Sequence, residues 1–212
     1  QVGIRIVGSA NNITANSATS RGFALRGNDT FIINNIISTP IGDEGAIDAN
    51  GIWNTTVSGN SIYVNSSGGQ VGIATQVTYN LNSTYNYIQV VQSGDSGFFI
   101  GSGNNITSEN DIINISGTGV ATAIIIGEGN LTVINTSFAR NSVSFNDLLG
   151  GKNGTLTIKR YVTINASNYT LGGINGSNVE VYNRSFTLIT NKTTNSSGIT
   201  NRLILDEYIQ NW

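Results

Sequence analysis

Short stretches in which apolar and polar residues alternate recur along the first two thirds of the chain, and each begins with glycine or another small residue. Alternation with a period of two places successive side chains on opposite faces of a β-strand. The pattern therefore predicts one short strand in each copy of a repeat. The six copies are GIRIVG from Gly3, GFALRG from Gly22, GAIDANG from Gly45, VGIATQV from Val71, GFFIGSG from Gly97 and ATAIIIG from Ala121.

A second landmark follows each copy: an asparagine that lies two residues before an apolar or small residue. Asparagine tolerates the left-handed backbone of a tight corner, and its amide can bond to equivalent amides above and below it. We therefore predict a structural asparagine ladder, in which one corner of successive turns is stacked. Its predicted members are Asn16, Asn34, Asn60, Asn86, Asn110 and Asn141, none of which begins an Asn-x-Ser/Thr sequence.

The third and fourth copies are in strict register. A shift of 26 residues maps Ile47 onto Ile73, Trp53 onto Tyr79, Asn60 onto Asn86, Ile62 onto Ile88 and Val64 onto Val90. A chain that repeats short strands without any helical segment can bury its apolar side chains by winding into a parallel β-solenoid. We expect such a solenoid, with about six turns, over residues 1–147, and a β-sandwich of alternating strands is the alternative.

The pattern changes after Asp147. Four longer alternating stretches, separated by Gly/Asn/Ser turns, predict a second, small β unit over residues 148–212; they are TLTIKRYVTI, NVEVYN, SFTLIT and RLILDEYI. Four strands are few for a free-standing sandwich, so this unit needs support from the solenoid end or from another chain. Charge also divides here, because residues 1–147 hold nine acidic and four basic residues (−5) and residues 148–212 hold three acidic and six basic residues (+3).

These repeats resemble the right-handed parallel β-helix proteins of the pectin-lyase-like class, especially the Gly/Asn/Ile coils of archaeal surface proteins and the NosD-like family. The resemblance covers about residues 1–147 and implies an all-β, right-handed parallel β-helix. The ending TNSSGITNRLILDEYIQNW looks like the small immunoglobulin-like or prealbumin-like modules appended to such archaeal proteins, which implies a β-sandwich-like C-terminal unit. The fold does not predict an activity, because this superfamily includes lyases, hydrolases, adhesins and structural proteins.

Composition removes several classes of function. The chain has no Cys, Met or His, so thiol and imidazole chemistry are excluded, as are the usual soft ligands of zinc and copper. The copper role of the NosD-like family therefore lacks its ligands, and we expect neither a metal nor a cofactor. The net charge of −2 offers no basic surface for a nucleic acid, and no apolar run is long enough to span a membrane.

Acceptor sequences for N-glycosylation are more than twice as frequent as composition predicts. Sixteen of the 31 asparagines begin Asn-x-Ser/Thr, whereas the composition alone would give roughly six or seven. We therefore expect an extracellular protein with covalent N-glycans; an accident of an Asn- and Thr-rich composition is the alternative. The acceptors are Asn12, Asn28, Asn54, Asn65, Asn82, Asn105, Asn114, Asn130, Asn135, Asn153, Asn165, Asn168, Asn175, Asn183, Asn191 and Asn195.

Carboxylates are the candidate catalytic groups, because β-helix lyases and hydrolases cleave polysaccharides with paired acids or with calcium and an arginine base. Asp43, Glu44 and Asp48 cluster near Pro40, where they could hold calcium. A solvated loop is the simpler interpretation of this acidic cluster, and we favour it over a calcium site. Glu109 and Asp111 flank Asn110, where a turn role is favoured over catalysis. We assign no catalytic or metal residue. The acids over residues 1–147 are Asp29, Asp43, Glu44, Asp48, Asp95, Glu109, Asp111, Glu128 and Asp147.

Five aromatic residues on neighbouring coils form a second candidate site: Trp53, Tyr63, Tyr79, Tyr85 and Tyr87. Exposed rings stack on sugars, but an aromatic ladder that stabilises the sheet explains the same pattern, and we favour it.

We expect an extracellular, N-glycosylated structural protein of an archaeal cell surface, in a filament, sheath, surface layer or adhesin. The coil pattern is already present at Val2–Ile6, so the first turn presents unpaired backbone groups. Either a preceding N-terminal segment of a longer chain covers it or a second copy does, and the segment RLILDEYIQNW is the candidate for the second case. Such a contact is head to tail and favours a filament. The alternative is a β-helix that binds or cleaves carbohydrates, with surface glycans as its partners.

Overall fold

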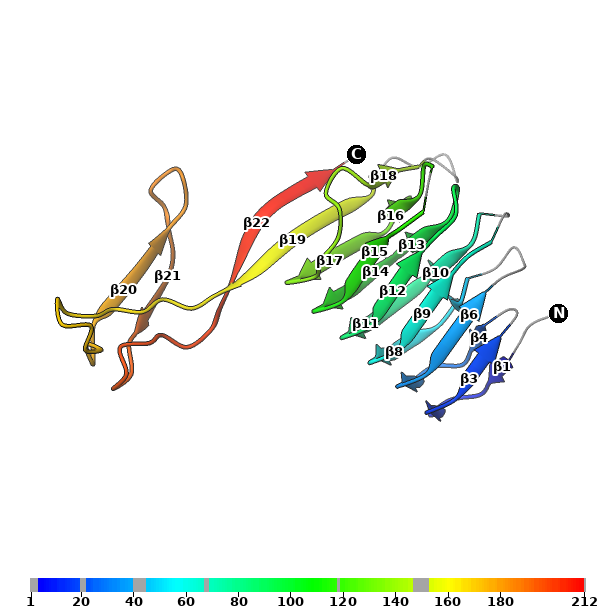
Figure 1. The fold of residues 1–212 in the computed structure, drawn as a ribbon, viewed down its shortest axis with the longest axis horizontal. Coiled ribbons are helices and arrows are strands. Elements are labelled where there is room, and N and C mark those ends of the chain that lie inside the picture. Colours follow the sequence, from blue (N-terminus) through cyan, green and yellow to red (C-terminus); the bar gives the residue numbers. More distant parts are fainter. Residues whose placement is uncertain are drawn as a thin grey trace. The chain divides into compact units, whose positions relative to one another are not determined.

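The computed structural model describes residues 4–19, 22–39, 45–66, 69–117, 119–146 and 153–211. Within these ranges the regular structure consists of strands, and none of the residues is helical. Three parallel sheets wind into a β-solenoid with five three-stranded turns and part of a sixth (Figure 1). The prediction of an all-β parallel solenoid over the first two thirds of the chain is confirmed.

Each complete turn contributes one strand to each of three sheets, here named A, B and C. Sheet A contains β1 (Ile4–Val7), β4 (Phe23–Arg26), β7 (Ile47–Asn50), β10 (Val71–Gln76), β13 (Ser96–Ile100), β16 (Thr122–Ile126) and β18 (Val143–Phe145). Sheet B contains β2 (Asn12–Thr14), β5 (Phe31–Ile33), β8 (Trp53–Ser58), β11 (Thr78–Thr84), β14 (Gly103–Glu109), β17 (Asn130–Ile134), β19 (Thr155–Val162) and β22 (Leu203–Asn211). Sheet C contains β3 (Ser17–Thr19), β6 (Ile36–Thr39), β9 (Ser61–Val64), β12 (Tyr87–Val90) and β15 (Ile112–Ile115).

The register between turns follows the repeats in the sequence. The six recurring stretches form six consecutive strands of sheet A. The shift of 26 residues between the third and fourth turns is confirmed in all three sheets: Ile47 pairs with Ile73, Trp53 with Tyr79, Ile62 with Ile88 and Val64 with Val90. Like residues therefore stack, and the inward positions form continuous apolar columns.

The core is a column of β-branched, leucine and phenylalanine side chains inside the solenoid. Phe23 and Phe98 are its largest fully buried side chains, and Ile47, Ile73 and Ile124 stack between and above them in sheet A. Isoleucine suits the inward positions of these strands, because its branched side chain packs well on a pleated sheet and loses little rotamer freedom there. Leu156 and Ile158 of β19 belong to the same core.

Left-handed backbone conformations form two columns, one within sheet B and one at the corner between sheets B and C. Several residues of both columns donate their backbone N–H to the next turn, as Asp29 does to Trp53, Asn34 to Ser58 and Tyr85 to Glu109. The first column is Ala10, Asp29, Asn54, Asn80 and Asn105, and the second is Ala15, Asn34, Gly59, Tyr85, Asn110 and Asn135. These bends fix where each turn changes direction.

The chain divides into two compact units: Gln1–Ile158 with Tyr208–Trp212, and Lys159–Glu207, which is called the arm below. The boundary expected after residue 147 falls outside the described residues. Within the arm, β20 (Asn178–Tyr182) and β21 (Leu188–Thr193) form a two-stranded antiparallel sheet with a bulge. Among the described residues no second sheet packs on this hairpin, so the arm differs from the expected immunoglobulin-like sandwich.

Three turns of the arm share one geometry. In each, an asparagine Oδ1 accepts the backbone N–H groups two and four residues later, which is an Asx turn. The fourth residue of each turn has a positive φ: 64° at Leu171, 59° at Phe186 and 77° at Gly198. The asparagines are Asn168, Asn183 and Asn195, and all three begin acceptor sequences.

Candidate functional site

An asparagine ladder runs along the corner between sheets B and C. The Oδ1 of Asn35, Asn60 and Asn86 each accepts the backbone N–H of the ladder residue in the preceding turn, at 2.9 Å. Each also accepts that residue's Nδ2, at 2.9–3.3 Å. Asp111 continues the column, because its Oδ1 accepts both nitrogens of Asn86. The members are Asn16, Asn35, Asn60, Asn86 and Asp111.

Two predicted members lie one residue too early. Asn34 and Asn110 belong to the adjacent left-handed column, and their neighbours Asn35 and Asp111 take the ladder position. The ladder residue lies two positions before the buried residue of the next strand, and Ile37 and Ile113 are buried. The prediction instead counts back two positions from Ile36 and Ile112, and these residues are 63% and 48% exposed. In an Ile-Ile pair the sequence does not say which residue points inward.

Asn141 is not part of the ladder. It is exposed and lies just before β18, a strand of sheet A. The corresponding corner residue in the sixth turn is Thr136, whose hydroxyl donates to the carbonyl of Ser108 at 2.9 Å and lies 3.0 Å from the Ser108 hydroxyl. The predicted place of Asn141 rested on Val143, which belongs to a different sheet.

Asp111 is a buried carboxylate that is held by hydroxyl and amide groups. Its Oδ2 accepts the hydroxyls of Ser83 and Ser108, both at 2.7 Å, and its Oδ1 accepts Asn86. Burial raises the pKa of the Asp111 carboxyl above 3.8, and the hydrogen bonds from Ser108, Ser83 and Asn86 oppose that rise. These contacts make Asp111 a member of the ladder inside the solenoid.

The other acids are dispersed. Asp48 pairs with Arg26 at 2.9 Å on the outer face of sheet A, and Asp95 is buried and accepts the backbone N–H of Gln70 at 2.8 Å. Asp29 receives the amide of Asn54 in the exposed column of sheet B. Asp43, Glu44 and Asp147 lie outside the described residues. Within the described ranges no three His, Cys, Asp or Glu residues gather as a metal site would require.

Ten of the sixteen acceptor asparagines belong to the solenoid unit, where they are unevenly distributed, and six belong to the arm. None lies on a described strand of sheet A. The side chains of all sixteen are at least partly exposed. On sheet B, the strands β2, β8, β11, β14 and β17 each carry one acceptor: Asn12, Asn54, Asn82, Asn105 and Asn130. Sheet B is thus the face that N-glycans would cover, and sheet A is the face that they would leave free.

Six acceptors already use their Nδ2, the atom to which an N-glycan is attached, as a hydrogen-bond donor. Asn105, for example, donates to Asn80 at 2.7 Å, and Asn80 donates to Asn54 at 2.9 Å, in an exposed amide column. The sequence pattern did not predict this second ladder, whose members all have a positive φ. The six acceptors are Asn54, Asn65, Asn105, Asn114, Asn130 and Asn135.

A groove of about 440 Å³ lies on the outer face of sheet A. Ala74, Phe99 and Ile125 pair in register across β10, β13 and β16 and form its apolar floor. One end is polar, with the Arg26–Asp48 ion pair and a 3.2 Å hydrogen bond from Asn50 to Gln76. Residues Gly45, Gly69 and Gly94 also line it. The sequence analysis missed this site, although its floor occupies the outward positions of the recurring stretches.

The five candidate aromatic residues lie on the outside of the solenoid rather than in its core. Trp53 and Tyr79 are neighbours on sheet B, and their rings meet edge to face with centroids 6.0 Å apart. Tyr63 and Tyr87 lie on sheet C, and Tyr85 occupies the left-handed corner between the two sheets. Tyr63 and Tyr87 accept the amides of Asn65 and Asn114. The group therefore spans two faces and does not form one flat platform.

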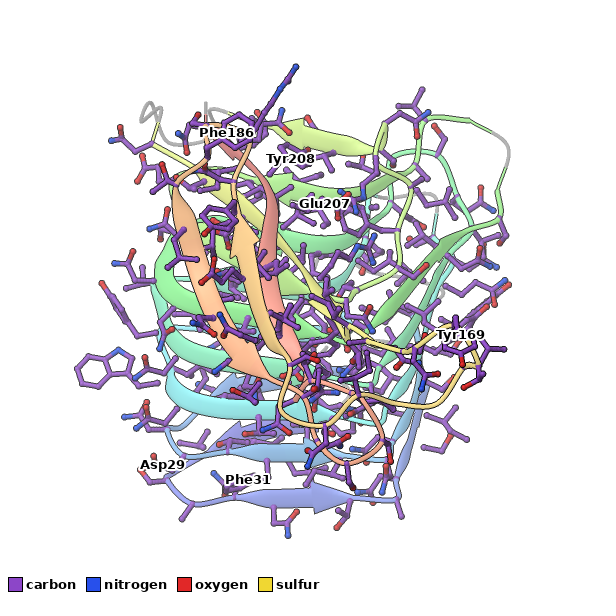
Figure 2. All side chains as sticks on the ribbon, turned by 90° about the vertical axis from the view of Figure 1, so that its left-hand side faces the viewer. Asp29, Phe31, Tyr169, Phe186, Glu207 and Tyr208 are labelled. Atoms are coloured by element: carbon purple, nitrogen blue, oxygen red, sulfur yellow. The ribbon has the colours of Figure 1, made fainter. Side chains whose placement is uncertain are left out.

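The arm exposes most of its apolar side chains. Tyr169 is 98%, Phe186 89% and Leu171 86% exposed, and all three lie in the Asx turns. Figure 2 labels Tyr169 and Phe186. Leu188 and Ile189 on β21 are about half exposed. Leu203 is the one large apolar side chain of the described arm that is buried. The arm has ion pairs between Lys159 and Asp206 and between Arg160 and Glu207, and Arg202 stacks on Tyr161, but it has almost no apolar core.

No helix among the described residues has the length and apolarity needed to cross a membrane.

No protein-family model and no curated protein matches this chain. A solved structure described as "a putative glycosyl hydrolase from Parabacteroides merdae ATCC 43184" is similar to it, with 11% sequence identity and a TM-score of 0.48. The similarity covers 64% of this chain and 77% of that protein.

Proposed function

We propose that the chain is an extracellular, N-glycosylated structural subunit that associates with further copies of itself in a surface filament, sheath, layer or adhesin. The observation that carries the proposal is the arm, which exposes Tyr169, Leu171, Phe186, Leu188 and Ile189 and buries little. Exposed apolar patches of this kind mark interaction sites, and an isolated two-stranded hairpin is only marginally stable in water. A partner that covers the arm satisfies both requirements.

The distribution of acceptor sequences supports the same function. Bulky sugars on sheet B would shield one side of each turn, and a sheet A without acceptors would remain available for protein contacts. A monomeric enzyme has no evident use for this division of faces. The absence of His and Cys and the dispersal of the described acids also favour a structural role over catalysis.

Sedimentation velocity of the full chain over a range of concentrations tests the proposal. We expect concentration-dependent oligomers, seen as filaments or sheets in electron micrographs. The double variant Leu188→Thr and Ile189→Thr keeps residues that favour strands but removes apolar surface, so it should weaken association. Val120→Thr, at an 80% exposed position of the solenoid, is the matched control and should have no effect. A full-length chain that stays monomeric at all concentrations contradicts the proposal.

Carbohydrate binding in the sheet A groove is the second candidate function. The observation that favours it is the combination of planar polar side chains, Asn50, Gln76, Asp48 and Arg26, with the ring of Phe99. Such groups bond to sugar hydroxyls and pack on sugar rings. Calorimetric titration with oligosaccharides, using Gln76→Ala as the variant that loses affinity, tests this function separately from self-association.

A further inference from the structure

We propose that the apolar hairpin tip of the arm inserts into the sheet A groove of a second copy of this chain. This inference rests on the proposed self-association and names the two surfaces that meet. The tip is Phe186, in the turn that joins β20 to β21, and the receiving floor is the register column of Ala74, Phe99 and Ile125.

The residue at the tip is the first line of evidence. Phe186 has a positive φ, which is unfavourable for large side chains and is usually left to glycine or asparagine. The turn from Asn195 has the same geometry and carries glycine, Gly198, at this place. Hydrogen bonds to Asn183 hold the backbone of the turn at Phe186, but the Phe186 side chain is 89% exposed and gains little from packing within the chain. Insertion into a partner would bury this ring.

The groove is the second line of evidence. It is apolar along its floor, has small residues at its side, and lies on the one sheet of the solenoid whose described strands carry no glycan acceptor. The other exposed apolar residues of the solenoid, such as Trp53, Phe31 and Tyr87, lie on sheets B and C among the acceptors. Sheet A is therefore the face that an arm can reach when the protein is glycosylated.

The available area agrees with a specific contact. Aromatic side chains bury roughly 150–250 Å² each, so Phe186 and Tyr182, at the same end of the hairpin, provide about half of the roughly 800 Å² per partner that a standard interface needs. Leu188 and Ile189 can supply part of the remainder. Because the two surfaces are unlike, the contact is heterologous and can extend from copy to copy.

Phe186→Gly tests the arm without endangering its fold, since glycine relieves the positive φ at that position. Ala74→Arg tests the groove by placing a long charged side chain on its floor, and Phe99→Ser tests the same floor by removing a ring. Phe31→Ala, at a 44% exposed position on sheet B, is the matched control. Circular dichroism verifies that each variant is folded before sedimentation.

We expect Phe186→Gly and either groove variant to raise the dissociation constant for self-association at least tenfold, and the combination to add little to the larger single effect. Phe31→Ala should leave that dissociation constant unchanged.

If the chain associates but neither the arm nor the groove variants change its dissociation constant, the docking inference is wrong while the proposed function stands. A full-length chain that never associates overturns both. Loss of oligosaccharide binding in Ala74→Arg with association unchanged would instead assign the groove to carbohydrate. A monomer whose melting temperature falls in both arm and groove variants would place the contact within one chain.

Discussion

Two neighbouring residues at the corner between sheets B and C perform different tasks in every turn. The first adopts the left-handed conformation that bends the chain, and the second places its side chain in the buried column. Asn34 and Asn35 are such a pair, and both are asparagines. Their identical chemistry makes them a direct comparison of the two tasks.

Asn35→Ala should therefore destabilise the protein, while Asn34→Gly should be tolerated. The Asn35 side chain bonds to Asn16, Asn60 and two carbonyl groups, and its loss costs about 1–3 kcal/mol because buried partners stay unsatisfied. Glycine at position 34 accepts the positive φ without strain. Thermal unfolding measures both, and Asn65→Ala in unglycosylated material is the exposed control.

Asn60→Ala and Asn86→Ala should behave like Asn35→Ala, since both residues occupy the same column. Equal melting temperatures for Asn34→Gly and Asn35→Ala would contradict the assigned role, because they would show that the side chains of the buried ladder do not stabilise the fold.

Asp111→Asn should stabilise the protein at neutral pH. Burial raises the pKa of the Asp111 carboxyl, so the folded chain holds this proton up to a higher pH than the unfolded chain does. Stability from this group therefore falls as pH rises through the window above 3.8 and stays lower beyond it. An asparagine continues the ladder without ionising, and Ser83 and Ser108 can rotate their hydroxyls to accept its amide.

Melting curves of both proteins between about pH 4 and pH 7 provide the measurement, because the advantage of Asp111→Asn should grow across that range. Asp48→Asn, which affects a surface ion pair with Arg26, is the control and should change stability by less than about 1 kcal/mol. A constant difference between Asp111→Asn and the parent at all pH values would contradict the assigned cause.

At the level of strands and turns, the left-handed column between sheets B and C contains one large aromatic residue. Tyr85 has a φ of 55°, while Ala15, Asn34, Gly59, Asn110 and Asn135 fill the equivalent corners. Its side chain is 66% exposed, so little packing compensates for the unfavourable backbone.

Tyr85→Asn should raise stability by about 1 kcal/mol, the usual penalty for a left-handed conformation in a residue other than glycine or asparagine. For a domain of this size that corresponds to roughly 2–4 °C in melting temperature. A lower melting temperature would mean that the Tyr85 ring packs on neighbouring turns more strongly than its exposure indicates.

The strands could be predicted from sequence because a period of two and a repeat near 25 residues are both visible in the chain. The register was predictable where unlike residues stack, as at Trp53 and Tyr79. It was not predictable at Ile36–Ile37 and Ile112–Ile113, where either residue could point inward. The sheet A groove escaped prediction for another reason: Phe99 and Ile125 alternate with core residues of the same apolar type, and only the structure separates the two faces.

At the scale of the whole molecule, the acceptor asparagines predict which side of the solenoid is covered. Glycopeptide mass spectrometry of native material should find sugars on the acceptors of sheet B and of the bend before β5, namely Asn12, Asn28, Asn54, Asn82, Asn105 and Asn130. Largely unmodified peptides at these six sites would contradict the expectation of a glycoprotein.

A new acceptor on sheet A should block association in a host that attaches N-glycans. The pair Ala74→Asn and Gln76→Thr creates Asn-Thr-Thr on β10, at the floor of the groove. The single change Thr56→Asn creates Asn-Val-Ser on β8 and removes the acceptor sequence at Asn54, so it moves a glycan site within sheet B and is the control. The first should shift the chain to monomers in sedimentation, and the second should not; the reverse result would place the contact face on sheet B.

The pairing between turns also determines how the solenoid carries mechanical load. Hydrogen bonds between successive turns lie along the solenoid axis, so tension along that axis stretches every interface between turns in series. Such a series breaks at its weakest interface. Among the described residues, the first three turns pair through three or four residues in each sheet, whereas the third to fifth turns pair through four to six. The fifth and sixth turns pair through four residues in each of sheets A and B and, at sheet C, through the single bridge between Ile112 and Ser137 among the described residues. A pulled solenoid should therefore yield first toward its two ends, and the long pairings of β8, β11 and β14 should survive as an unbroken segment.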